Sequence, residues 1–94
     1  MFKLLKVTGT SMQPSLHHGD FVVVYSHFLN IQVGELVIAK HPSLPNMIKR
    51  VLKVDSKQRV LLAGDHSSSI SSINIGWIPR SQITHKVFFR IRRY

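Results

Sequence analysis

Six short runs of apolar and β-branched residues, bounded by glycine and proline turns, constrain the fold of this chain more than any other feature. Runs of this length between such turns are typical of β-strands and are too short for most helices. The sequence therefore predicts an all-β protein. Only residues 11–18 could form one short helical turn, because Pro14 is tolerated in a first turn and Gly19, which follows the segment, would end it. The six predicted strands lie within residues 2–7, 21–26, 35–41, 47–54, 59–63 and 83–91.

The size and composition of the chain limit what it can be. Its 94 residues predict a single domain spanning 1–94, with one core that any active site must share. It has no cysteine, which excludes disulfides, thiolate nucleophiles and cysteine-ligated zinc. No apolar run approaches the roughly 20 residues of a membrane-spanning helix, and residues 1–7 are too short for the apolar region of a signal peptide. We expect a cytoplasmic protein without a transmembrane segment.

Positive charge is the strongest bias in the composition. Thirteen Lys and Arg against four Asp and Glu give a net charge of +9. The C-terminal stretch concentrates this charge, because Lys86, Arg90, Arg92 and Arg93 are interspersed with apolar residues there. Two interpretations stay open: a solvated edge strand whose charges prevent aggregation, or a surface for nucleic acid or an anionic membrane.

Ser11 is the first candidate for chemistry. It lies in GTSMQPSLHHGD, residues 9–20, just before a predicted strand. A serine hydroxyl is a poor nucleophile at neutral pH, so it needs a base and hydrogen-bond donors for the oxyanion that it creates. A turn entered through Gly9 can expose both the hydroxyl and backbone N–H groups. Without a base, however, a plain turn serine explains the stretch equally well.

Lys49 is the candidate base. Strand alternation places it on one face with Met47 and Val51, and places Arg50 on the other face with Ile48, Leu52 and Val54. Apolar neighbours would desolvate the amine and lower its pKa, which is how lysine becomes a general base. The alternative is a surface lysine whose ammonium reaches water. Arg50 stays protonated, so we expect it to form an ion pair with a carboxylate such as Asp65.

The segment after residue 63 and the histidines are less informative. Asp65 follows Gly64 at the end of a predicted strand, and the serines of residues 67–72 either orient an amine or form a polar loop. Adjacent His17 and His18 have no third ligand spaced near them, so we expect solvated loop histidines and no metal site.

In this order, these segments resemble the signal peptidase I family of serine proteases, which use a serine and a lysine as a catalytic pair. The resemblance identifies Ser11 as the nucleophile and Lys49 as the general base, with Arg50 its usual neighbour. It implies a small β-barrel-type catalytic domain of coiled antiparallel sheets, as in signal peptidases and LexA. Glu35 stands where the family usually has Asp. The matching segments are residues 9–24, 33–42, 47–52 and 63–79.

The supporting residues differ from the family pattern. His66 stands where the family has Asn, and one residue is deleted between it and Gly76. Ser69 then takes the position that orients the lysine, with Ser68 or Ser71 as alternatives. Gly9 occupies the place where some members supply a hydroxyl to the oxyanion hole, which leaves backbone N–H groups of Ser11 and Thr10 to serve.

The short arrangement, without an anchor or a second β-domain, is most similar to the nickel-type superoxide dismutase maturation protease. That subgroup removes an N-terminal propeptide, so the expected partner is a precursor protein and no cofactor is needed. Cleavage of leader peptides of the signal-peptidase type is an alternative. The LexA-type self-cleaving domain is disfavoured, because no DNA-binding domain precedes Ser11. A basic β-barrel that binds nucleic acid is the alternative outside the proteases, although we expect no nucleic acid.

Overall fold

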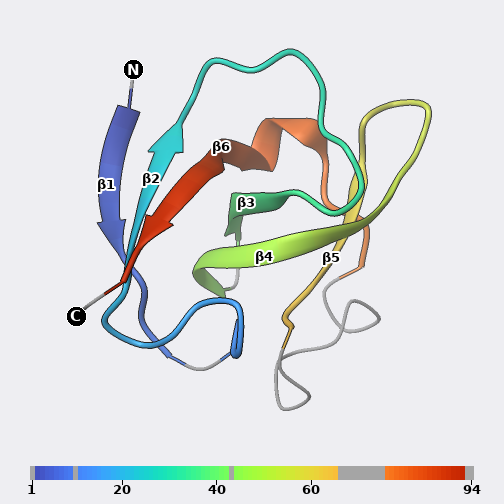
Figure 1. Ribbon diagram of the computed structural model, residues 1–94. Coiled ribbons are helices and arrows are strands. Elements are labelled where there is room, and N and C mark those ends of the chain that lie inside the picture. The colour runs from blue at the N-terminus through green and yellow to red at the C-terminus, as the bar shows by residue number, and fades with distance from the viewer. Residues whose placement is uncertain (1, 10, 43, 66–75, 93–94) are drawn as a thin grey trace.

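All six predicted strands are present. The computed structural model describes residues 2–9, 11–42, 44–65 and 76–92, and Figure 1 shows how their strands are arranged. The one helical element among them is a short 3₁₀ turn, η1 (Arg80–Gln82). The strands are β1 (Phe2–Lys6), β2 (Phe21–Tyr25), β3 (Leu36–His41), β4 (Leu44–Val54), β5 (Val60–Ala63) and β6 (Ile83–Ile91).

The strands form one antiparallel sheet in the order β1-β2-β6-β3-β4-β5. The sheet is strongly coiled, so that β4 crosses the view of Figure 1 at a steep angle to β1. The prediction of an all-β fold of coiled antiparallel strands is confirmed. In the described part of the chain, β3 pairs with β6 only up to Lys86, so the rest of β6 has β2 as its one partner and the edge-strand interpretation of the C-terminal stretch stays open.

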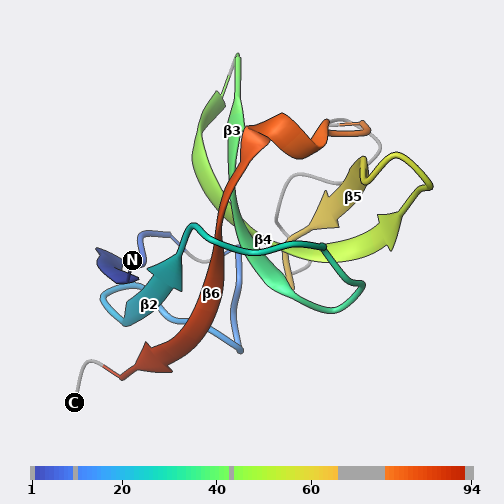
Figure 2. The same cartoon turned by 90° about the horizontal axis from the view of Figure 1, so that it is seen from above.

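Coiling buries both faces of the central strands in two clusters. On β3, Val37 and Ala39 lie in the first cluster, while Ile38 lies between them in sequence but in the second cluster. Alternating side chains point to opposite faces of a strand, so β3 contributes to both clusters. Figure 2 shows the same sheet from above, with β3 and β4 curving away from β2.

Two local predictions are corrected. Val54 packs against the first cluster together with Val51, because a bulge at Leu52 shifts the register between β4 and β5. An extra residue in a strand reverses the alternation beyond it. Residues 11–18 form turns with one helix-like hydrogen bond, from the Leu16 N–H to the Met12 carbonyl at 2.9 Å, as the sequence allowed. The 3₁₀ turn η1 lies instead where no helical turn was expected.

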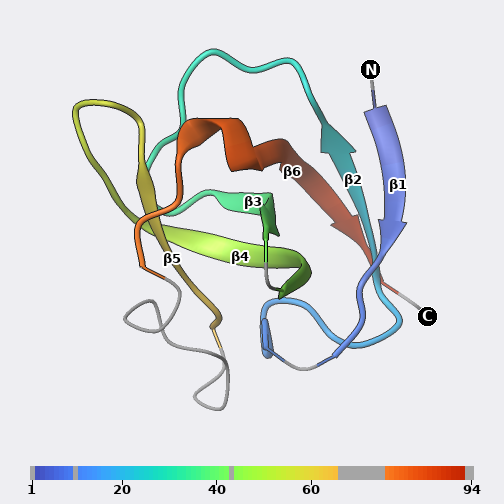
Figure 3. The same ribbon diagram turned by 180° about the vertical axis from the view of Figure 1, so that it is seen from behind.

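Within the described ranges, no helix has the length and hydrophobicity that a membrane crossing requires. The connection between β1 and β2, which carries Ser11, passes beside the first half of β4 (Figure 3). This placement forms the site described next.

Candidate active site

A cavity of about 440 Å³ contains both residues predicted to carry the chemistry. Ser11 reaches it from the turn after β1, and Lys49 reaches it from β4. The remaining lining is mainly apolar, which lowers the local dielectric around both groups. Its members, besides Ser11 and Lys49, are Leu5, Lys6, Val7, Thr8, Ile38, Asn46, Met47 and Ile48.

Lys49 is nearly inaccessible to solvent, with 4% of its surface exposed. It lies opposite Val37 of β3, so its strand position is fixed by the β3–β4 pairing. Burial lowers the pKa of its amine from the ordinary lysine value, since desolvation penalises the charged form. Within the described residues, no carboxylate forms an ion pair with this amine to restore the charge. The alternative of a surface lysine is therefore wrong.

Ser11 is partly exposed on a turn that two buried side chains anchor. Met12 and Leu16 are each only 2% exposed and belong to the second cluster, so they fix the turn on the sheet. Gly9 begins this turn with a φ of +84°, a conformation that favours glycine. The Gly9 N–H donates to Nδ1 of His18 at 3.0 Å. This contact ties the two ends of the segment together.

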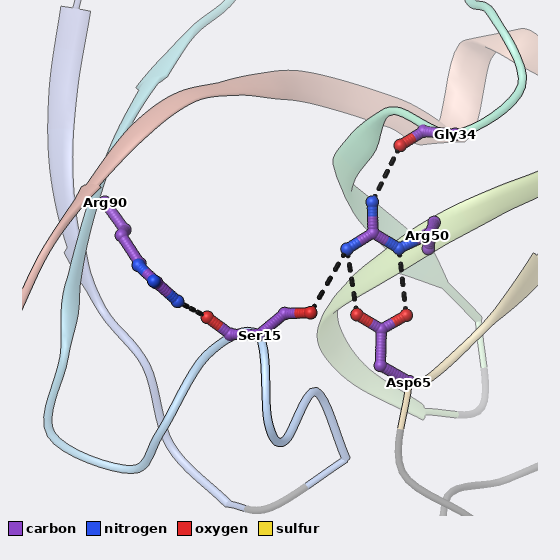
Figure 4. Close-up of polar contacts among 5 residues, drawn as sticks. All are labelled: Ser15, Gly34, Arg50, Asp65 and Arg90. Atoms are coloured by element: carbon purple, nitrogen blue, oxygen red, sulfur yellow. Dashed lines mark hydrogen bonds and ion pairs between the residues drawn. The ribbon is translucent and has the colours of Figure 1, made fainter.

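Arg50 and Asp65 form the predicted ion pair (Figure 4). Nε and one terminal nitrogen of Arg50 donate to the two carboxylate oxygens at 2.9 and 2.8 Å. The pair forms because Arg50 lies opposite Ala63 in the β4–β5 register, and Asp65 follows two residues later. The hydrogen bonds from Arg50 hold the pKa of Asp65 below its usual value, and those to Asp65 raise the pKa of Arg50.

The same arginine reaches the serine turn. A terminal nitrogen of Arg50 lies 3.4 Å from Oγ of Ser15, and the other donates to the Gly34 carbonyl at 2.8 Å. From the opposite side, the Arg90 guanidinium donates to the Ser15 carbonyl (Figure 4). Two arginines from distant strands thus hold a residue four positions after Ser11.

The residues predicted to support Ser11 and Lys49 are not seen in the cavity. Thr10 and Ser69 lie outside the described residues, as do His66, Ser68 and Ser71. Gly9 does not line the cavity, and its N–H is already paired with His18.

Sequence reasoning missed three contacts around the turn. It did not assign Ser15 or Arg90 to the site, and it took His18 for a solvated loop residue. His18 is exposed as expected, but it also accepts the Gly9 hydrogen bond. The position of Ser15 four residues after Ser11, within the same turn, was an available signal for its role. For Arg90 the sequence held no such signal, because β6 is distant in the chain.

The side chains of the cavity suggest what chemistry the arrangement can support. No group of three or more His, Asp or Glu in the described part of the chain could hold a metal ion. A hydroxyl and a desolvated amine in one cavity can perform nucleophilic and general-base chemistry.

Comparison with known proteins places the chain among proteases. A family model described as Peptidase S24-like matches residues 2–83. Mitochondrial inner membrane protease subunit 1 from Mus musculus is 32% identical over 109 aligned positions, covering 89% of this chain and 66% of the mouse protein. The Homo sapiens protein of the same name is 42% identical over 53 positions, covering 51% of this chain and 32% of the relative.

The chain thus spans just under two thirds of the length of the mouse relative. These matches confirm the prediction of a signal-peptidase-like protease, while the nickel superoxide dismutase maturation subgroup stays a prediction. Because the family model matches most of the residues of this chain, the chain belongs to the Peptidase S24-like family.

Proposed function

We propose that this protein is a serine endopeptidase in which Ser11 is the nucleophile and Lys49 the general base. Its proposed substrate is a precursor protein from which it removes an N-terminal propeptide, with the nickel superoxide dismutase precursor as the first candidate. The family match supports a peptidase, and the choice of precursor rests on the sequence resemblance.

One observation carries the proposal: Ser11 shares an apolar-walled cavity with a lysine whose burial lowers its pKa. A neutral amine accepts a proton, whereas an ammonium ion does not. Burial therefore increases the fraction of Lys49 that can act as a base at a given pH.

The proposed reaction proceeds in two stages. Lys49 Nζ takes the hydroxyl proton as Ser11 Oγ attacks the peptide carbonyl, and the backbone N–H of Ser11, helped by Thr10, stabilises the oxyanion. The protonated Lys49 then delivers its proton to the leaving amine, and an acyl-enzyme forms on Ser11. In the second stage Lys49 activates a water molecule that hydrolyses the ester, and the serine hydroxyl is restored.

Free strand edges beside the cavity support binding of an extended peptide. β1 pairs only with β2 within the described residues, and β4 before Arg50 pairs only with β3 there. Lys6 on β1 and Asn46 on β4 both line the cavity. A peptide strand that hydrogen-bonds to either edge would have its backbone next to Ser11.

The test is cleavage of the nickel superoxide dismutase precursor, followed by mass spectrometry. Ser11→Ala and Lys49→Ala should each lower kcat/KM by at least about a thousand-fold, because the two groups act as a unit. Ser56→Ala and Lys53→Ala change exposed residues of the same types and should cleave at the wild-type rate.

The outcomes separate the parts of the proposal. Full activity of Lys49→Ala would exclude the serine–lysine pair. An intact precursor would reject this substrate, and a leader-peptide substrate of the signal-peptidase type would then be assayed with the same variants. Salt-sensitive binding of nucleic acid by the wild type and Ser11→Ala, with no cleavage of either substrate, would favour the nucleic-acid module.

A further inference from the structure

The turn that carries Ser11 begins at a hydrogen bond to a titratable side chain. The Gly9 N–H donates to Nδ1 of His18 at 3.0 Å, although the two residues are nine positions apart. A ring nitrogen accepts a hydrogen bond only while it carries no proton, so this contact requires a neutral imidazole with its proton on Nε2. Because His18 is exposed, its ring exchanges protons with the solvent. The contact therefore depends on the protonation state of His18.

The backbone on both sides of His18 is held independently of its ring. The Gly19 N–H donates to the Val7 carbonyl at 2.9 Å, and the Val7 N–H donates to the Asp20 carbonyl at 2.7 Å. The His17 N–H donates to Oδ2 of the buried Asp20, and the Asp20 N–H donates back to the His17 carbonyl, each at 3.0 Å. None of these bonds uses an imidazole, so the backbone keeps His18 at the end of β1 whatever the charge of its ring.

Ser11 lies between a buried anchor and the His18 contact. Met12, the next residue, is 2% exposed within the second cluster and fixes the C-terminal side of Ser11. Gly9, two residues before Ser11, is exposed, and among the described residues no atom beyond its chain neighbours lies within 4 Å of where a Cβ would stand. Side-chain packing therefore does not hold Gly9, and the hydrogen bond to His18 fixes the N-terminal side of Ser11.

We propose that His18 is a positioning residue that holds Ser11 for reaction only while its imidazole is neutral. This inference rests on the proposed serine–lysine mechanism, in which the Ser11 hydroxyl and backbone N–H must be aimed at one carbonyl. Histidine side chains change charge between about pH 5 and 8, so acidification through this range removes the acceptor and releases the start of the turn. His18 does not line the cavity, so it acts through Gly9.

Other groups around the turn also respond to pH or carry charge, and the test must separate them from His18. Lys49 is the proposed base, so its own protonation also slows the reaction at low pH. The remaining charged or titratable groups lie on the turn itself, on the strands beside it or in contact with Ser15: Lys6, His17, Asp20, Arg50, Asp65, Arg90 and Arg92. All of them are present in a variant that changes His18 alone, so their effects cancel in its comparison with the wild type.

His18→Asn is the variant that separates the charge of the ring from the hydrogen bond. Its Oδ1 is as many bonds from Cα as Nδ1 of histidine and accepts a hydrogen bond at any pH in this range. At about pH 7.5 the variant should cleave the precursor with the kcat of the wild type. At about pH 5.5 the wild-type kcat should be about fivefold below that of His18→Asn, with similar KM values. Lys49 titrates in both proteins and cancels from the ratio.

Two further variants complete the comparison. His18→Ala lacks the acceptor, so its kcat should be about fivefold below that of His18→Asn at both pH values. His17→Asn is the matched control, because it changes the adjacent exposed histidine. It retains the Gly9 contact with His18 and should follow the pH profile of the wild type.

Nuclear magnetic resonance tests the contact without the reaction. At about pH 7.5 the ¹⁵N shifts of His18 should show an unprotonated Nδ1 and a protonated Nε2. The backbone of Ser11 should then be as ordered as that of Met12. Acidification to about pH 5.5 should lower the order of Ser11 in the wild type and leave it unchanged in His18→Asn.

The outcomes distinguish this inference from the proposed function. A kcat ratio of wild type to His18→Asn that is the same at both pH values would overturn the inference, as would wild-type activity of His18→Ala at about pH 7.5. If neither the wild type nor any variant cleaves the precursor, the proposed function fails with that substrate and the order of Ser11 decides. Loss of order on acidification in the wild type alone would then support the role of His18, and unchanged order would reject it.

Discussion

Lys49 is almost completely buried, and no carboxylate among the described residues forms an ion pair with it. Its pKa therefore depends on whether the chain is folded, because only folding removes the amine from water. Because its pKa is lower in the folded chain than in the unfolded chain, the unfolded chain binds more protons between the two values. The free energy of unfolding should therefore rise with pH over that range, with a slope of at most about 1.4 kcal/mol per pH unit.

Replacing Lys49 with methionine tests this linkage. Lys49→Met removes the titrating group but keeps a long side chain, so the rise of stability with pH should disappear. Below the folded pKa of Lys49 the variant should melt at a higher temperature than the wild type, because no charge is buried. Thermal unfolding from neutral to alkaline pH measures both effects. Lys53→Met is the control, since Lys53 is exposed on the same strand; identical pH profiles for the two variants would contradict the assignment.

At the scale of elements, the Arg50–Asp65 pair connects β4 to the segment after β5 and to the serine turn. Its planar guanidinium makes two parallel hydrogen bonds to one carboxylate, which lysine cannot reproduce. Arg50→Lys should therefore lower the free energy of unfolding by about 1–2 kcal/mol. It should also reduce kcat by about tenfold, because the turn that carries Ser11 loses a contact.

A second arginine–aspartate pair is the matched control for Arg50→Lys. Arg59 and Asp55 form a similar contact in the β4–β5 connection, but the Arg59 side chain is 52% exposed. Arg59→Lys should leave the free energy of unfolding close to that of the wild type, because exposed ion pairs contribute little, and should leave kcat unchanged. Chemical denaturation and the precursor assay measure these quantities. Equal effects of the two substitutions would show that Arg50 acts only as a surface charge.

The strands could be predicted from sequence because each apolar run is bounded by turn residues, and this local signal survives in the fold. Strand alternation also put Lys49 with Val51, and both are buried. The bulge at Leu52 was not predicted, since it depends on how β5 pairs with β4. Likewise, the contact of Arg90 with Ser15 joins residues that are distant in the chain, so no local pattern reveals it.

At the scale of the molecule, the two hydrophobic clusters share strands and should not unfold separately. Val37 and Ile38, adjacent on β3, belong to different clusters, and β6 likewise contributes Ile83 to the first cluster and Val87 to the packing around the second. If one cluster unfolded, the strands that it shares with the other cluster would lose their pairing, and the apolar side chains of the second cluster would become exposed as well. The prediction of one domain over 1–94 thus becomes a prediction of one cooperative transition.

Val24→Ala tests this coupling with the single tryptophan as a reporter. Val24 is fully buried in the second cluster, whereas Trp77 adjoins Ile78 of the first. The truncation should lower stability by about 2 kcal/mol and the melting temperature by about 10 °C. Circular dichroism and Trp77 fluorescence should shift together, because the strands that hold the second cluster also hold the first. A fluorescence midpoint that stays at the wild-type temperature while the circular dichroism midpoint falls would show two independent units.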